Sequence, residues 1–235
     1  MVQLKLTGRS SILTSNFYPP IKLPEHPKIG LIYFTTYNTI QNITQHCYRI
    51  KVAGKIIEIP FGSYEVVSIN EHIRTILQET FGDEEKSKVK FELKANHNTF
   101  QCEILCSRTV DLSIENSIAP ILGFKNDIYE ANKTHKSPLP VSIIKVNTIN
   151  IVCDQIRSSY QNNAESHCLY SCPMNTAPGY RIVNRPNFPI FLPLKEQDYL
   201  QTITLKIVDQ DFTLIDFQDE LIEICIVISS SAPYS

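Results

Sequence analysis

The sequence predicts a mainly β protein built as a sandwich. Val, Ile, Leu, Thr, Tyr and Phe gather in short runs, and Pro, Asn, Asp and Ser separate these runs. Several runs also alternate: in Val89–Lys94 the apolar residues are 89, 91 and 93, and in Leu200–Ile207 they include 203, 205 and 207. A period of two places one face of a strand on a core and the other in water.

The expected strands follow one another along most of the chain. Two of them contain the apolar runs Ile29–Phe34 and Ile222–Ile228, which we expect to be covered on both faces. The expected strands are Val2–Thr7, Ile12–Phe17, Ile29–Tyr37, Cys47–Val52, Lys55–Ile59, Lys88–Lys94, Thr99–Cys106, Val141–Val152, His167–Ser171, Tyr180–Val183, Ile190–Leu194, Leu200–Val208, Phe212–Phe217 and Leu221–Ser229.

Turn residues between these runs predict hairpins. Gly54 separates two expected strands and accepts a positive φ without steric cost. Asn96–Asn98 and Asp209–Asp211 separate two further pairs, and Asn and Asp favour tight turns.

Two segments show helical rather than strand periodicity. In Ser68–Gly82 the apolar residues fall at 69, 73, 76, 77 and 81, which predicts a helix over Ile69–Phe81. Ser68 with Glu71 matches a capping box, and Gly82 is placed to end the helix. A second, short helix is expected over Asn116–Gly123, capped by Asn116 or Ser117 and ended by Gly123.

These helices lie in a β-α-β-β-α segment, residues 57–124, that a plain sandwich does not need. We expect it to be a small α+β insertion or subdomain within a single domain spanning 1–235. The polar stretch Lys125–Pro140 is expected to be a loop or hinge between an N-terminal α+β part and a strand-rich C-terminal part.

Composition excludes several functional classes. The formal net charge is −2, so no global attraction to DNA, RNA or anionic lipid is expected. Only 7 residues are glycine, and neither GxxxxGK nor GxGxxG occurs, which argues against a phosphate-binding loop.

We expect a protein without a secretory signal and without a membrane span. The N-terminal residues lack an apolar core, and the longest apolar run, Leu221–Ile228, is short and interrupted by Glu223. The 7 cysteines are an odd number, which favours reduced, buried thiols over a disulfide framework.

A catalytic or metal site is not expected. Neither HExxH nor GxSxG occurs. A Ser-His-Asp triad is not excluded by the sequence, because residues far apart along the chain can form one in the folded protein. Cys102 and Cys106, with His167, Cys168 and Cys172, have spacings that zinc permits. Residues i and i+4 of a strand also share a face, and free cysteine is commonly buried, so core thiols are the preferred interpretation.

Two clusters of residues can be interpreted either as ordinary structural groups or as binding sites. The acidic residues are preferred as a solvated hairpin tip rather than a calcium loop, since their spacing is not that of an EF-hand. The aromatic residues are preferred as core or interface groups rather than a platform for bases, because no basic residues are interleaved with them. These two clusters are Asp209, Asp211, Asp216, Asp219 and Glu220, and Phe17, Tyr18, Tyr33, Phe34 and Tyr37.

An ordered set of short strings extends from about residue 10 to 229. The strings are Ser15–Pro20 (SNFYPP), Gly30–Ile43 (GLIYFTTYNTIQNI), Ile121–Phe124 (ILGF), Val146–Asp154 (VNTINIVCD), Ser166–Tyr170 (SHCLY), Leu192–Leu194 (LPL) and Val208–Gln210 (VDQ). Their order and spacing resemble the minor capsid protein, or penton, of Polinton (Maverick) elements and related adintoviruses. The sequence departs from that pattern at Asp211-Phe212 and at Asn162-Asn163, where a glycine is expected.

The resemblance implies a single jelly roll that assembles as a homopentamer at the vertices of an icosahedral capsid. It implies the major capsid protein of the same element as a partner, no direct nucleic-acid binding, no cofactor, no catalytic residue, and a place in the virion. Ring contacts are then expected at exposed aromatics beside loops, such as Tyr18, Tyr37 and Phe188. The alternatives are a carbohydrate- or receptor-binding β-sandwich, and a cupin-like enzyme, which would need clustered histidines.

Overall fold

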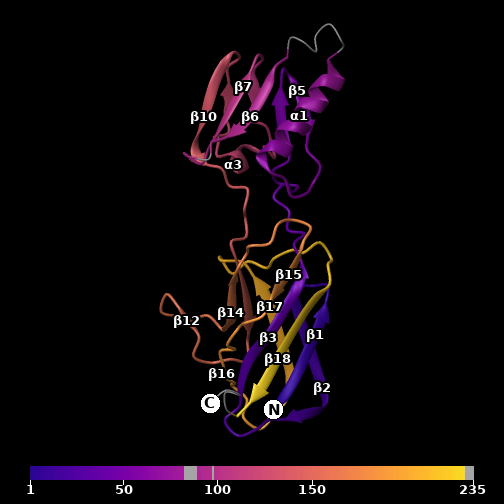
Figure 1. Ribbon diagram of the computed structural model, residues 1–235, viewed down its shortest axis with the longest axis vertical. Helices are drawn as coiled ribbons and strands as arrows, with labels where there is room; N and C mark the ends of the chain where they lie inside the picture. The colour runs from indigo at the N-terminus through magenta and orange to yellow at the C-terminus, as the bar shows by residue number, and fades with distance from the viewer. Residues whose placement is uncertain (82–88, 97, 231–235) are drawn as a thin grey trace. The chain divides into compact units, whose positions relative to one another are not determined.

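The computed structural model describes residues 1–81, 89–96 and 98–230 (Figure 1). The chain divides into two compact units. Unit 1 comprises Met1–Ile40 and Val146–Ser235, and unit 2 comprises Gln41–Lys145. The described part of unit 1 contains strands and no helix, whereas the described part of unit 2 contains strands and the two helices α1 and α3.

Unit 1 forms two facing sheets. Sheet 1 has the strand order β1-β18-β3-β15, with β16 also paired to β3, and sheet 2 has the order β14-β11-β17-β2. A separate small hairpin joins β12 to β13. The strands are β1 (Val2–Gly8), β2 (Ile12–Lys22), β3 (Lys28–Tyr37), β11 (Thr148–Cys153), β12 (Tyr160–Gln161), β13 (Ala164–Glu165), β14 (Cys168–Pro173), β15 (Arg181–Asn184), β16 (Leu192–Pro193), β17 (Tyr199–Val208) and β18 (Ile222–Ser229).

The pairing order of these strands is that of a jelly roll. Leaving aside the short β12, β13 and β16, the first strand pairs with the last, β1 with β18, and the second with the one before last, β2 with β17. The next pairs inward are β3 with β15 and β11 with β14, all antiparallel. This is a long hairpin rolled into a two-sheet sandwich, so the predicted mainly β jelly roll is confirmed.

Alternation along the strands produces the core between the two sheets. Ile203, Leu205 and Ile207 of β17 point inward and are fully buried, and Ile224 and Ile226 of β18 join the same core. Both faces of β18 are covered, as expected, since the intervening Cys225 is also buried. Glu223 is the only charged residue of this strand, and its position marks the outward face.

Unit 2 is inserted between β3 and β11 and has its own hydrophobic core. A four-stranded sheet has the order β5-β4-β8-β9 and a three-stranded sheet the order β10-β7-β6. The elements are β4 (Arg49–Val52), β5 (Lys55–Glu58), α1 (Val66–Thr80), β6 (Phe91–Ala95), β7 (Gln101–Cys106), β8 (Val110–Asp111), α3 (Ala119–Leu122), β9 (Ile128–Tyr129) and β10 (Lys133–Pro140).

The boundaries of this unit are wider than the expected 57–124 segment. Asn42 shows why: its amide nitrogen donates to the carbonyl oxygens of Tyr64 (2.7 Å) and Ile143 (3.3 Å), and its Oδ1 accepts from the Tyr64 N–H (2.9 Å). The residues where the chain enters and leaves unit 2 are therefore tied to the same side chain. This long-range amide contact has no periodic signal in the sequence.

The long helix lies close to its predicted position, but the capping box is wrong. Helix α1 starts at Val66 with Glu65 as N-cap, and no side chain caps it. Ser68 is therefore inside the helix. Ile69, Ile73 and Leu77 are buried as predicted, because this 3.6-residue period faces the core. The predicted stop at Gly82 lies outside the described residues.

The short helix α3 ends as predicted. Gly123 takes a left-handed conformation, with φ of 75°, and its N–H bonds back into the helix. At the other end, the N-cap is Ile118, and the Ser117 hydroxyl accepts the N–H of Ala119 at 3.2 Å.

Three expectations about strands and loops are wrong. Residues 133–140 form β10, not a loop; β10 is an edge strand, where charged residues and Pro138 cost no ladder hydrogen bond. Residues 141–147 precede β11 instead of forming part of it. Residues 212–217 form no strand, because Asp209 Oδ1 accepts the N–H groups of Asp211 and Thr213 and turns the chain.

The expected division of the chain is also wrong. Residues 1–40 belong with the strand-rich C-terminal part in unit 1, and not with the α+β part. The two departures from the family pattern both fall at positive φ: Phe212 at 60°, and Asn162 and Asn163 at 48° and 67°. Non-glycine residues thus occupy backbone conformations that favour glycine.

Replacing Ile73 with Asp is expected to destabilise unit 2 by about 3–5 kcal/mol, because the carboxylate would be buried without a partner. Val67→Asp on the same helix is the matched control, since Val67 is 60% exposed, and should change stability by no more than about 0.5 kcal/mol. Thermal unfolding followed by circular dichroism measures both. Equal melting temperatures for the two variants would contradict the burial of this helix face.

Replacing Gly123 with Ala is expected to cost well over 2 kcal/mol, since an added Cβ would lie 2.2 Å from the Leu139 carbonyl oxygen as well as adopt a left-handed φ. Gly54→Ala is the control: Gly54 also has a positive φ, of 81°, but no atom lies within 4 Å of its added Cβ. It should lose only the left-handed strain, about 1–2 kcal/mol. Urea unfolding of both variants tests the difference.

Candidate functional site

The metal candidates fall in separate parts of the chain. Cys102 and Cys106 lie on β7 of unit 2, whereas His167, Cys168 and Cys172 lie at and along β14 of unit 1. Among the described residues, no three His, Cys, Asp or Glu side chains gather as a metal site would require. The expected absence of stoichiometric zinc stays a prediction, which elemental analysis of the purified protein tests.

The environment of these thiols is that of a core. Cys102 and Cys106 are buried on one face of β7, as a strand period of two predicts. Burial raises the pKa of Cys102 to about 12 and that of Cys172 to about 11. Both are therefore protonated at neutral pH, whereas a zinc ligand or nucleophile is a thiolate.

The His167 and Cys168 side chains contact polar groups of neighbouring segments. His167 has a positive φ of 52°, and its Nδ1 lies 3.1 Å from the Ile156 carbonyl oxygen. The half-buried Cys168 Sγ lies 3.3 Å from the Ser171 hydroxyl oxygen. That hydroxyl donates to Asn150 Oδ1.

The acidic cluster forms turns rather than a convergent cage of oxygens. Asp209 Oδ1 accepts two backbone N–H groups, and Asp216 Oδ1 accepts the N–H of Gln218 at 2.8 Å. Arg9 approaches Asp219 at 3.9 Å. The carboxylates therefore stabilise the connection between β17 and β18, as the solvated-tip interpretation predicts.

The five aromatic candidates divide between the core and the surface. Phe34 is fully buried, and Phe17 packs partly against the same core. Tyr33 donates to Glu223 Oε1 at 2.6 Å. Tyr18 and Tyr37 are exposed, as is Phe188 beside its loop. The three aromatics expected at the surface are thus accessible for contacts with another molecule.

A charged cluster on the outward face of sheet 1 was not predicted. Its centre is Glu223, whose carboxylate pairs with Lys5 Nζ at 2.8 Å and accepts from Tyr33. The hydrogen bonds from Lys5 and Tyr33 hold the pKa of Glu223 below its usual value, and the Glu223 carboxylate raises the pKa of Tyr33. The sequence signal for it was the lone charge at Glu223 in an apolar strand.

Two arginines extend this cluster: Arg181 lies on β15, and Arg185 lies directly after it. Arg181 Nε donates to the Thr35 hydroxyl at 3.0 Å, and the Arg185 guanidinium lies 5.5 Å from the centre of the Tyr33 ring. Both arginines are exposed. The arrangement orients positive charge at one edge of sheet 1, which can bind an anionic surface but contains no nucleophile with an adjacent base.

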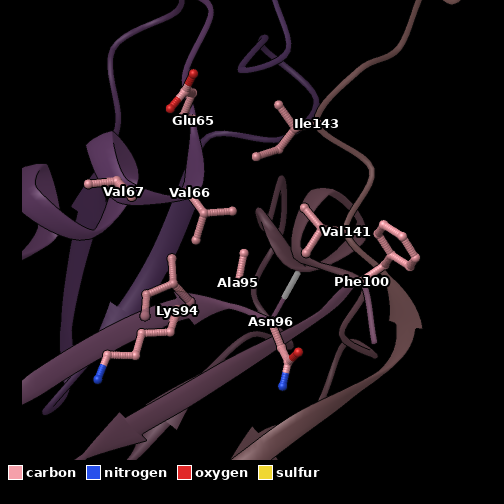
Figure 2. Close-up of a pocket in the computed structure, with 10 residues that line it drawn as sticks. Glu65, Val66, Val67, Lys94, Ala95, Asn96, Phe100, Val141 and Ile143 are labelled. Atoms are coloured by element: carbon pink, nitrogen blue, oxygen red, sulfur yellow. The ribbon is translucent and has the colours of Figure 1, made fainter. Parts of the chain in front are cut away.

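Unit 2 carries an open groove of about 500 Å³ (Figure 2). Val66 from the start of α1, Ala95 from β6, and Val141 make its wall apolar, and Phe100 lies at one side. Lys94 at its border pairs with Glu92 at 2.7 Å. Among the described residues, no histidine, cysteine or serine lines the groove, and its charged lining residues are Glu65 and Lys94. The apolar wall suits an apolar group.

The chain is similar in fold to a solved structure, although its sequence matches no known family model. No curated protein matches the chain. The crystal structure of the mavirus penton protein is similar, with 11% sequence identity and a TM-score of 0.49. The similarity covers 98% of this chain and 99% of that one. Among the described residues, no helix has the length and apolar character needed to cross a membrane.

Cys168 is expected to be the one thiol that reacts rapidly in the native protein, since the other six are buried. An aromatic disulfide reagent at about pH 8 should label about one thiol quickly and all 7 after denaturation. Cys168→Ser should remove the fast phase, and Cys172→Ser should keep it. A fast phase that persists in Cys168→Ser would show that a buried thiol is accessible.

Proposed function

We propose that this chain is a structural capsid protein, the penton that stands as a homopentamer at the vertices of an icosahedral shell. The observation that carries the proposal is the complete jelly-roll wrapping of unit 1, from β1 paired with β18 to β11 paired with β14. Jelly rolls of this kind build viral capsids and also lectins. The ordered strings that resemble the Polinton and adintovirus penton favour the capsid role.

The proposed assembly agrees with the two edges of the sandwich. On one side the sheets end at β1 and β2, and on the other at β15 and β14. Because these sides differ in sequence and charge, a contact between them is heterologous, and heterologous contacts form rings where the rotation between copies closes. Exposed aromatics, which are enriched at protein interfaces, lie at both sides: Tyr18 on β2, and Tyr180 next to β15.

The proposal places the protein in the virion of a virus-like DNA transposon, beside the major capsid protein of the same element. It needs no cofactor and no catalytic residue. The inserted unit 2 and its groove are then available for contacts that the jelly roll does not make.

A second candidate is a carbohydrate- or receptor-binding module. Hydroxyl and amide groups line the outward face of sheet 2: Thr14 and Thr204 lie 3.0 Å apart through their hydroxyl oxygens, and the Thr202 hydroxyl donates to Asn16 Oδ1 at 2.8 Å. Two exposed tyrosines, Tyr18 and Tyr199, lie on the same pair of strands. Aromatic rings beside hydroxyls and amides are chemically suited to sugars. Binding to a glycan array by a monomeric protein would favour this candidate.

The penton proposal predicts a pentamer in solution. Sedimentation velocity and native mass measurement across micromolar concentrations, in salt of about 0.15 M, should give a mass of five chains. Electron microscopy should show five-fold rings. A monomer at every concentration, without rings, would contradict pentamer formation by the isolated protein.

A further inference from the structure

The edge of sheet 1 at β15 carries positive charge that the described part of the chain balances only in part, since the Glu223 carboxylate attracts Arg181 through space. Arg181, Val183 and Arg185 alternate with inward residues and share the outward face. Val183 is 56% exposed, and the ion pairs found among the described residues involve neither arginine. The nearby Glu223 already pairs with Lys5. We call Arg181, Val183 and Arg185 the basic edge.

A complementary surface lies on the same unit. The residues Asp216–Glu220, which we call the acidic turn, hold three carboxylates before β18. The turn has a defined shape, because Asp216 accepts both the backbone N–H and the side-chain amide of Gln218. Asp219 is near Arg9, whereas Asp216 and Glu220 have no ion pair among the described residues. Leu221, directly after the turn, is 50% exposed.

The acidic turn and the basic edge lie at the same end of the sandwich, where the turn leads into the central strand β18 and the basic edge belongs to β15. The Thr39 hydroxyl donates to the Phe217 carbonyl oxygen, which places the turn at the end where β3 finishes. Ile222 pairs with Gly8 at the β1 edge, and Arg181 pairs with Tyr37 at the β15 edge. Two strand spacings separate β18, which follows the turn, from β15, about 10 Å. No ion pair joins the two surfaces among the described residues, so a neighbouring copy can contact them.

We propose that the acidic turn and Leu221 of one copy dock on the basic edge of a second copy. The argument is charge complementarity combined with exposed apolar residues on both sides, Leu221 on one and Val183 on the other. Each copy presents both surfaces once, so the contact is head-to-tail. The inference rests on the proposed function, and it names the surfaces and the partner of the ring contact.

We expect the contact to determine how the two copies are oriented more than to contribute most of the binding free energy. Exposed ion pairs contribute little one by one and are screened by salt. Several such pairs around an apolar centre orient the partners and exclude wrong contacts. Raising the salt concentration from about 0.1 M to about 1 M, where the Debye length falls from about 10 Å to about 3 Å, should therefore weaken assembly.

Charge reversal with rescue tests the proposal in the full chain. Arg181→Glu with Arg185→Glu reverses the basic edge, and Asp216→Lys with Glu220→Lys reverses the acidic turn. Each double variant should raise the concentration for half-assembly at least tenfold at about 0.1 M salt. The quadruple variant should assemble again, because both surfaces have exchanged sign. Asp216→Asn with Glu220→Gln, which keeps an acceptor for Gln218, is a milder second test with the same expected direction.

Matched controls lie at the other end of the sandwich. Lys22→Glu with Arg157→Glu, and Glu25→Lys with Asp198→Lys, make the same charge changes at exposed positions. The backbone N–H of Leu23 bonds to the Asp198 carbonyl oxygen, and that of Arg157 to Pro193, which places these residues at the far end. The controls should assemble as the wild type does, and circular dichroism should show that every variant is folded.

The outcomes separate this inference from the proposed function. Wild-type assembly that both reversed variants retain, or a folded quadruple variant that stays dissociated, would overturn the docking contact and leave the capsid role standing. A wild type that is monomeric throughout would overturn the contact and remove the support for a pentamer. Loss in each double variant with recovery in the quadruple supports the contact.

Discussion

The pairing of β1 with β18 is the interaction on which the jelly roll depends. It joins residues from the two ends of the sequence, such as Leu4 with Ile226, and places β18 between β1 and β3. A central strand has both of its backbone edges satisfied, so β18 can be apolar and buried on both faces. The outward Cys225 is covered as well, since the Gln3 side-chain amide lies 3.0 Å from its sulfur. The remaining strand pairs follow inward from this closure.

The sequence predicts local features of this fold well where burial and periodicity coincide. The alternation in β17 and the helical period of α1 are set by the core that each element faces, so the pattern is visible along the chain. The pairing of strands is not visible in this way, because no pattern in residues 2–8 identifies residues 222–229 as the strand with which they pair. Periodicity predicts a β-sandwich, and the prediction of a jelly roll rests on the family resemblance.

The incorrect predictions of strand and unit boundaries have a common physical origin: side chains that form hydrogen bonds with the backbone. Asp209 turns the chain before a run that otherwise has strand composition. Asn42 ties together the two ends of unit 2, and Ser137 accepts the N–H of Cys102 beside the edge strand β10. Such contacts are specific to the fold and leave no periodic trace. For the same reason the cluster around Glu223 could be suspected from one charge in an apolar strand, while its partners Lys5 and Tyr33 could not.

The insertion of unit 2 between β3 and β11 has a consequence for the order in which the molecule is made. The partners of β1, β2 and β3 all come from residues after 180, whereas unit 2 is complete at Lys145. The ribosome adds about 5–20 residues per second, so the stretch from Ile40 to Ile222 takes on the order of 10 to 40 s to synthesise. During this time unit 2 can fold through its local contacts, whereas the strands β1, β2 and β3 have no partner strand. Long-range closure of this kind is slow and exposes strand edges, so the nascent chain is a natural substrate for chaperones until its last strand emerges.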